Sequence, residues 1–284
     1  MARRLAGFLT AILGSIAPDQ ALAHALAQRY ELPVPLGLFL VAAGGAVALS
    51  FALLATSAPA PSGKLRYPTF ELSGTPLGRR GSMILHRLLQ GIGLAVFLLV
   101  LAAGFIGSRH GLKNIAPVLV WVIWWVGLTF VCSLLGNVWP ALNPWRTLFS
   151  LAESLLPGGR TRRLPWVYPD RLGAWPAVAL FLVFAWMELV WAGAEQPRAL
   201  AWAILAYSAL TWGGMTVYGK EAWLRDAEPF SVYFGILGRF APVSGGAGDP
   251  DPPGTLRPHA VALTPDRPLS GSRLVFVILM LAVV

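Results

Sequence analysis

The chain has 284 residues, of which 56% are hydrophobic and only 12% are charged, and its formal net charge is +9 at neutral pH. A soluble domain carries about 25% charged residues, and here the apolar residues gather into long uncharged runs, so an ordinary soluble protein is excluded and an integral membrane protein is predicted. The single cysteine, Cys132, lies inside an apolar run, which excludes an intramolecular disulfide and a thiolate metal cluster. No nucleic-acid partner is expected. The positive charges gather in alternate connections between the apolar runs, which is the pattern that sets the orientation of a membrane protein.

The first 23 residues resemble a secretory signal peptide. Arg3 and Arg4 form a positive start, residues 5–17 form a short apolar stretch, and Ala21 to Ala23 form a small-x-small cleavage site. Pro18 and Asp19 cut the apolar stretch too short to cross a bilayer. We therefore expect residues 1–23 to be removed and residues 24–284 to form the mature membrane domain.

Five apolar runs are each long enough to cross a bilayer as a helix, which needs about 20 residues at about 1.5 Å rise per residue. These runs cover residues 36–55, 88–107, 115–135, 174–194 and 199–219. A further apolar run at 274–284 has half that length, so we expect a sixth helix to begin there and the chain to continue beyond it. The predicted fold is an all-α, polytopic transmembrane helix bundle.

The basic residues of the connections give the orientation of these helices. Segments 56–87, 136–173 and 220–273 together hold 16 Lys and Arg residues, whereas the alternate connections hold three, Arg109, Lys113 and Arg198. The positive-inside rule places the first group in the cytoplasm and the mature N-terminus in the periplasm of a bacterial inner membrane. Within the third inner segment, residues 243–272 are rich in Gly and Pro with little to bury, so we expect a flexible cytoplasmic loop.

Two short amphipathic helices are predicted at the cytoplasmic interface. Asn143 is a good N-cap and Pro144 suits the first helical position; Trp145 then begins an apolar face, with Arg146 on the other side. Glu228, Pro229 and Phe230 open a second such segment. Neither segment can span, so each should lie along the membrane surface, where Trp and Arg side chains are well accommodated.

The two segments also suggest an internal repeat. Their prolines are 85 residues apart (229 minus 144), and the apolar runs before them, starting at 115 and 199, are offset by almost the same amount. One interpretation is a parallel duplication of a spanning helix followed by an interfacial helix. The alternative is that any inner loop can lie on lipid, and the sequence leaves both open.

Glu188 is the only acidic residue inside a predicted span. An ionisable group at that depth is costly, so Glu188 is a candidate for handling a proton or substrate. The alternative, a protonated or water-reaching residue that stabilises helix packing, stays open and is the plainer interpretation. Arg109, His110 and Lys113 form a small basic patch on the outer side, which can also simply meet water or headgroups. The charged segment 220–229 is expected to form a solvated ion-pair network on the inner face.

No metal site is expected, because the four histidines are scattered with no HxH or HExxH pairing. The segment 214–221, GMTVYGKE, nearly matches a P-loop, but Glu221 stands where a hydroxyl should hold magnesium and the segment ends an apolar run instead of following a strand. Nucleotide binding is therefore rejected, and the sequence leaves the question of a cofactor open.

Four stretches, YELPVPLGLFL, GNVWPALNPWRTL, LGAWPAVALFLVFAWMELV and EPFSVYFGILGRFAP, occur in this order. In order and wording they resemble a group of bacterial multi-pass membrane proteins that are commonly labelled fenitrothion hydrolase. The resemblance covers most of residues 22–242. It implies a longer chain with further helices and, through the label, hydrolysis of organophosphate esters, but it carries over no catalytic residues.

Three functional hypotheses follow. The first is a membrane-bound hydrolase that acts on apolar phosphotriesters reaching it through the lipid bilayer. The second is a transporter or channel-like protein in which an intramembrane Glu forms part of a polar path. The third is a structural subunit of a larger membrane complex.

Overall fold

The computed structural model describes residues 67–72, 76–155, 166–245, 249, 251–263 and 269–283, together with scattered helical positions between 37 and 49. The chain divides into two units, Met1–Gly63 and Lys64–Val284. The predicted signal peptide lies outside the described residues, and the predicted span 36–55 is described only at those scattered positions. The second unit contains every element that follows.

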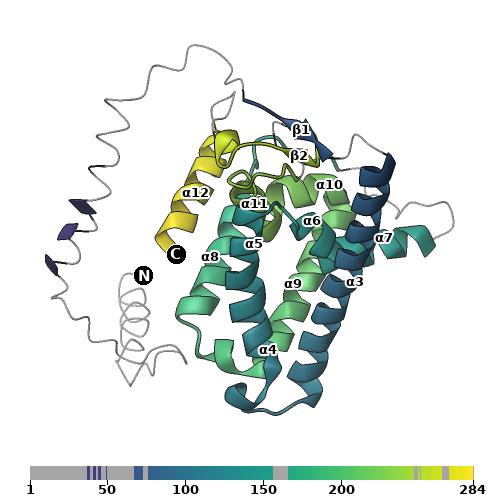
Figure 1. Cartoon of the computed structure of the whole chain (residues 1–284). Helices are drawn as coiled ribbons and strands as arrows, with labels where there is room; N and C mark the ends of the chain where they lie inside the picture. Colours follow the sequence, from purple (N-terminus) through teal and green to yellow (C-terminus); the bar gives the residue numbers. More distant parts are fainter. Residues whose placement is uncertain are drawn as a thin grey trace. The chain divides into compact units, whose positions relative to one another are not determined.

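The second unit is built almost entirely of helices (Figure 1). In chain order its elements are β1 (Phe70–Glu71), α3 (Pro76–Ile106), η2 (Gly111–Lys113), α4 (Ile115–Pro117), η3 (Val118–Gly127), α5 (Leu128–Leu134), α6 (Trp139–Leu142), α7 (Pro144–Leu155), α8 (Trp175–Leu189), η4 (Ala192–Glu195), α9 (Pro197–Tyr218), α10 (Lys220–Ala222), η5 (Trp223–Ala227), α11 (Pro229–Leu237), β2 (Thr255–Leu256), η6 (Val261–Leu263) and α12 (Gly271–Val283). The prediction of an all-α bundle is confirmed.

Three helical stretches among the described residues are long and apolar enough to cross a membrane: Arg80–Ile106, Ile115–Leu134 and Pro197–Tyr218, with mean hydropathies of 2.4, 2.2 and 1.3. The chain is therefore a membrane protein. The second stretch joins α4, the π-helix η3 and α5 into one rod. Helices α8 and α12 are also apolar, but at 15 and 13 residues they are shorter than a full span.

The helices approach one another closely where α3 carries glycine. A methyl group built onto Gly104 would lie 2.6 Å from the Ala201 side chain of α9, and one built onto Gly93 would lie 1.9 Å from the Leu142 carbonyl oxygen of α6. Small residues allow two membrane helices to pack backbone to backbone. Helix α3 therefore rests on α9 and α6 through positions that tolerate no side chain.

Aromatic side chains fill the centre of the bundle. Trp125 of η3 lies 4.7 Å from both Phe184 of α8 and Tyr233 of α11, measured between ring centroids. Phe184 in turn packs edge to face on Phe230 at 4.9 Å. Such pairs contribute about 0.5–1.5 kcal/mol each beyond the area they bury. They join a spanning rod, a shorter apolar helix and α11 into a single core.

The segment 251–263 is an ordered part of the bundle, so the prediction of a flexible loop over 243–272 is wrong there. Arg257 has a fully buried side chain that pairs with Asp249 and Asp251, and Tyr67 donates a hydrogen bond to Asp251 at 2.9 Å. Strand β2 pairs antiparallel with β1. The Gly and Pro content does not reveal these contacts, of which the hydrogen bond from Tyr67 joins residues 184 positions apart.

Candidate functional site

Helix α7 begins inside the bundle at a buried asparagine. Asn143 is 1% exposed, and its Oδ1 accepts a hydrogen bond from the backbone N–H of Arg146 at 3.0 Å. Pro144, which follows, has a fixed φ and no N–H to satisfy, so it fits the first turn. The Asn-Pro pair thus starts a helix at a depth where no water is available to its backbone.

Helix α11 begins at Glu228, which is also completely buried. Its Oε1 accepts from the Phe230 N–H at 3.1 Å and its Oε2 from the Ser231 N–H at 2.7 Å, and the hydroxyl of Tyr207 also donates to Oε1. All three donors are uncharged.

These contacts fix the depth of Glu228 in the bundle. Tyr207 lies halfway along the 22 residues of α9. Phe230 packs at 4.7 Å against Trp124, which lies halfway along the stretch Ile115–Leu134. After α9 ends at Gly219, whose φ of +87° suits only glycine well, α10 and η5 carry the chain back into the bundle. The segment 219–237 therefore turns back and packs among the helices of the bundle.

This arrangement corrects the prediction that α11 lies along the membrane surface. Its apolar face is buried in protein, with Phe234 at 0% and Tyr233 at 2% exposure. A pattern of apolar residues does not distinguish a face that contacts lipid from one that contacts other helices. Phe230 and Pro229 are core residues as well.

Helix α7 is buried in its first half, at Pro144, Trp145 and Phe149. Trp145 donates from Nε1 to Ser208 Oγ at 2.8 Å, and Trp212 of α9 donates to the Trp145 carbonyl at 3.3 Å. The helix then leaves the bundle sideways (Figure 1), and Leu155 at its end is 76% exposed. The interfacial position predicted for α7 stays a prediction.

The two repeats of the proposed duplication contact each other. Helix α7 of the first repeat packs on α9 of the second repeat. Helix α11 of the second repeat packs on α5 of the first, where Tyr233 and Thr129 share a hydrogen bond of 3.2 Å. Each repeat has the same order of elements: a spanning stretch, a short helical segment and a capped helix that opens with proline. This shared order and reciprocal packing favour the duplication. The candidate functional site is the place where the two capped starts meet at Tyr207 and Ser208.

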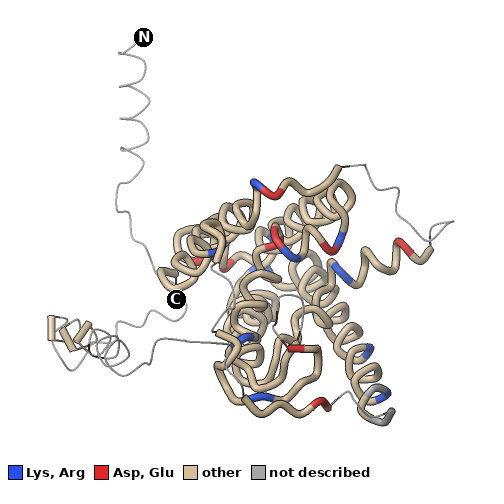
Figure 2. Tube along the Cα trace, turned by 90° about the horizontal axis from the view of Figure 1, so that it is seen from above, with Lys and Arg blue, Asp and Glu red and all other residues tan. Residues whose placement is uncertain are grey.

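The charged residues at the ends of α7 and α9 form ion pairs at the edge of this site. Arg146 pairs with Glu221 at 3.1 Å and Lys220 with Glu153 at 2.7 Å. In Figure 2 charged positions are sparse along the trace, and red and blue often lie side by side. The predicted ion-pair network of segment 220–229 thus includes these pairs, but Glu228 lies apart from it in the core.

Glu188 lies near the end of α8 and is partly buried. Arg109, His110 and Lys113 are all exposed in the turn between α3 and α4. A Cβ built onto Gly111 of that turn would lie 2.5 Å from the Glu195 carbonyl, so the basic patch lies beside η4, which follows α8.

The sequence reasoning missed the α9 side of the site, namely Tyr207, Ser208 and Thr211. Their spacing at i, i+1 and i+4 within an apolar run puts Tyr207 and Thr211 on one helical face, and this polar face was the available signal. Ser208 is 1% and Thr211 0% exposed, so this polar face is buried in the bundle.

Within residues 67–283, as far as they are described, no three His, Cys, Asp or Glu side chains lie close enough together to hold a metal ion. Comparison with protein-family models, with curated proteins and with solved structures returned no match. The site has to be interpreted from its own chemistry.

Removing the hydrogen bond between Trp145 and Ser208 would test whether this bond holds α7 against α9. We expect Ser208→Ala to lower the free energy of unfolding by about 1–3 kcal/mol, because the buried indole N–H loses its acceptor. Ser133→Ala is a matched control, since each serine also donates to a carbonyl four residues earlier in its own helix. Thermal unfolding of both variants in detergent would check this, and equal shifts would contradict the role of the indole.

Proposed function

We propose that the chain is a membrane transport protein in which Glu228, held by Tyr207, takes up and releases a proton during transport. The observation that supports this most is the fully buried Glu228 carboxyl, bonded only to uncharged donors beside the middle of a spanning helix. Ionisable groups at such depth are expensive and typically functional. Transporters place their sites where repeated units meet and where interrupted helices begin.

Glu228 suits this role better than Glu188, the candidate that the sequence offered. Glu188 is one residue from the end of its helix, whereas Glu228 is bonded to Tyr207 halfway along α9. Glu228 lies at the N-terminus of α11, whose dipole and N–H groups stabilise the carboxylate, while burial stabilises the neutral acid. These opposing effects allow the carboxyl to change protonation state without losing its hydrogen bonds.

The test is proton flux in proteoliposomes that contain a pH-sensitive dye. We expect Glu228→Gln to lose nearly all protein-dependent flux, because the amide keeps the shape but binds no proton. Tyr207→Phe should reduce flux and shift its pH dependence, because the donor to Oε1 is gone. Glu221→Gln is the matched control, since Glu221 is exposed and paired with Arg146.

Folding is checked separately by size-exclusion profile and thermal unfolding. Full flux in a folded Glu228→Gln variant would overturn the proposal, as would wild-type liposomes without flux above empty liposomes. Hydrolysis of organophosphate esters, which the sequence resemblance implies, stays a prediction; release of a nitrophenol product by the purified wild-type protein would measure it.

A further inference from the structure

Helix α3 is longer than the apolar core of a bilayer is thick. The distribution of Lys and Arg predicts that its first residues face the cytoplasm, and this end extends beyond the core. The apolar stretch Arg80–Ile106 has 27 residues, or about 40 Å, whereas the hydrocarbon core is about 30 Å thick. The other two spans have 20 and 22 residues and match that thickness. About seven residues of α3 are therefore in excess.

The polar side chains show which end is in excess. The last turns of α3 are apolar up to Ile106, whereas Arg80, Ser82, His86, Arg87 and Gln90 occupy its first turns. A core span of about 20 residues counted back from Ile106 begins near Arg87. The residues from Arg80 to Arg87 then lie at the level of the lipid headgroups.

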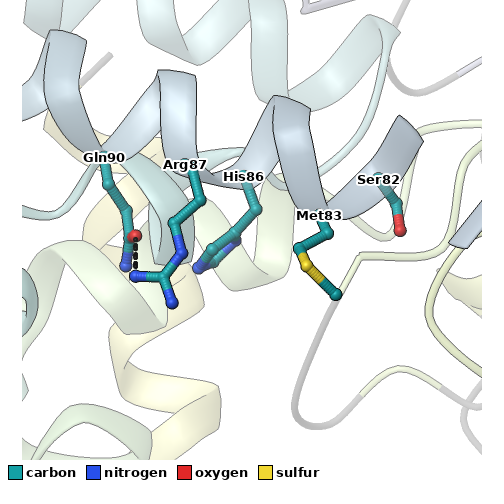
Figure 3. A pocket seen from close by; sticks show the side chains of 5 residues that line it. All are labelled: Ser82, Met83, His86, Arg87 and Gln90. Carbon is teal, nitrogen blue, oxygen red and sulfur yellow. Dashed lines mark hydrogen bonds between the residues drawn. The ribbon is translucent and has the colours of Figure 1, made fainter. Parts of the chain in front are cut away.

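The same part of α3 presents a shallow open hollow. It is lined by Ser82, Met83, His86, Arg87 and Gln90. These side chains project from one side of the helix (Figure 3), and Arg87 Nη1 lies 3.4 Å from Gln90 Oε1. Gln90 is neutral, so this contact leaves the Arg87 charge uncompensated. Met83 is 65% and Ile84 61% exposed, which gives the hollow an apolar margin.

We propose that this hollow binds the headgroup phosphate of an anionic phospholipid. Helix α3 carries Arg80 and Arg87 and contains no Asp or Glu, so the described charges at its start are positive. Guanidinium groups pair with phosphate oxygens through two parallel hydrogen bonds, and His86 adds a donor at the same level. Exposed Met83 contacts the glycerol and first acyl carbons, which a soluble anion does not possess.

The test compares lipid binding to the purified full chain by native mass spectrometry, with phosphatidylglycerol or phosphatidylcholine added. An anionic lipid surface attracts a basic residue by about 1 kcal/mol, so Arg87→Gln should weaken phosphatidylglycerol binding about fivefold. Phosphatidylcholine binding should not change. Arg109→Gln, which removes the same charge in the exposed turn after α3, should bind phosphatidylglycerol as the wild type does.

Three results would overturn the proposal. One is equal retention of the two lipids by the wild type. Another is unchanged phosphatidylglycerol binding in Arg87→Gln. The last is displacement of the lipid by inorganic phosphate at an equal concentration, which would indicate a site for a soluble anion. None of these results depends on transport through Glu228.

Discussion

Replacing Arg257 with methionine is expected to lower the free energy of unfolding by about 3–5 kcal/mol, because it leaves buried carboxylates without their counter-charge. The guanidinium side chain is fully buried and donates to Asp249 and Asp251, the latter at 2.9 Å, and to the Ala241 carbonyl at 3.4 Å. Asp251 also accepts from Tyr67, so the loss should release strand β1 as well as β2. Thermal unfolding in detergent and limited proteolysis between residues 245 and 263 would measure both effects.

Arg225→Met provides the control. Arg225 also pairs with an aspartate, Asp226, at 2.8 Å, but its side chain is 57% exposed, and exposed pairs contribute about 0–1 kcal/mol. Adding Asp249→Asn to the Arg257 variant should recover part of the lost stability, since one uncompensated charge is removed. Equal melting of the Arg257 and Arg225 variants would show that the buried pair does not hold the segment.

The part of this fold that sequence predicts best is the part governed by local rules. Apolar runs of span length became α3, the rod ending at Leu134, and α9, and the helices that open with Pro144 and Pro229 begin at those prolines. Hydrophobic length and capping act within a few residues, so they can be read directly from the chain. The burial of Arg257 could not be predicted in this way. Its partner Asp251 also accepts a hydrogen bond from Tyr67, which lies 184 residues away in the sequence.

The acidic residues illustrate the same limit at the candidate site. Glu188 attracted attention because its neighbours in sequence are apolar. Glu228 sits in a charged segment and looked like a surface residue, yet the return of the chain through η5 places it in the core beside Tyr207. Burial is a property of the path that the backbone takes. The sequence feature that could have indicated a buried polar partner lies in α9. Its polar face at Tyr207 and Thr211 needs a hydrogen-bonding partner that the apolar run itself does not supply.

The contact between α3 and α6 gives the second large effect. We expect Gly93→Ala to destabilise the protein by about 1–3 kcal/mol, because the new methyl group would meet the Leu142 carbonyl oxygen at 1.9 Å and force the two backbones apart. Gly91→Ala should do the opposite. A methyl group at Gly91 has nothing within 4 Å, and alanine is favoured over glycine in a helix by about 1 kcal/mol.

The two variants therefore separate close packing from helix propensity on a single helix, two residues apart, and thermal unfolding in detergent reports the sign of each. Leu142 directly precedes Asn143, which starts α7, so a shift of α6 also moves Trp145 relative to Ser208 and Tyr207. Gly93→Ala should consequently reduce proton flux even below its melting temperature, while Gly91→Ala leaves flux intact. Stabilisation by both alanines would mean that α6 does not rest on Gly93, and the depth assigned to the start of α7 would lose one of its supports.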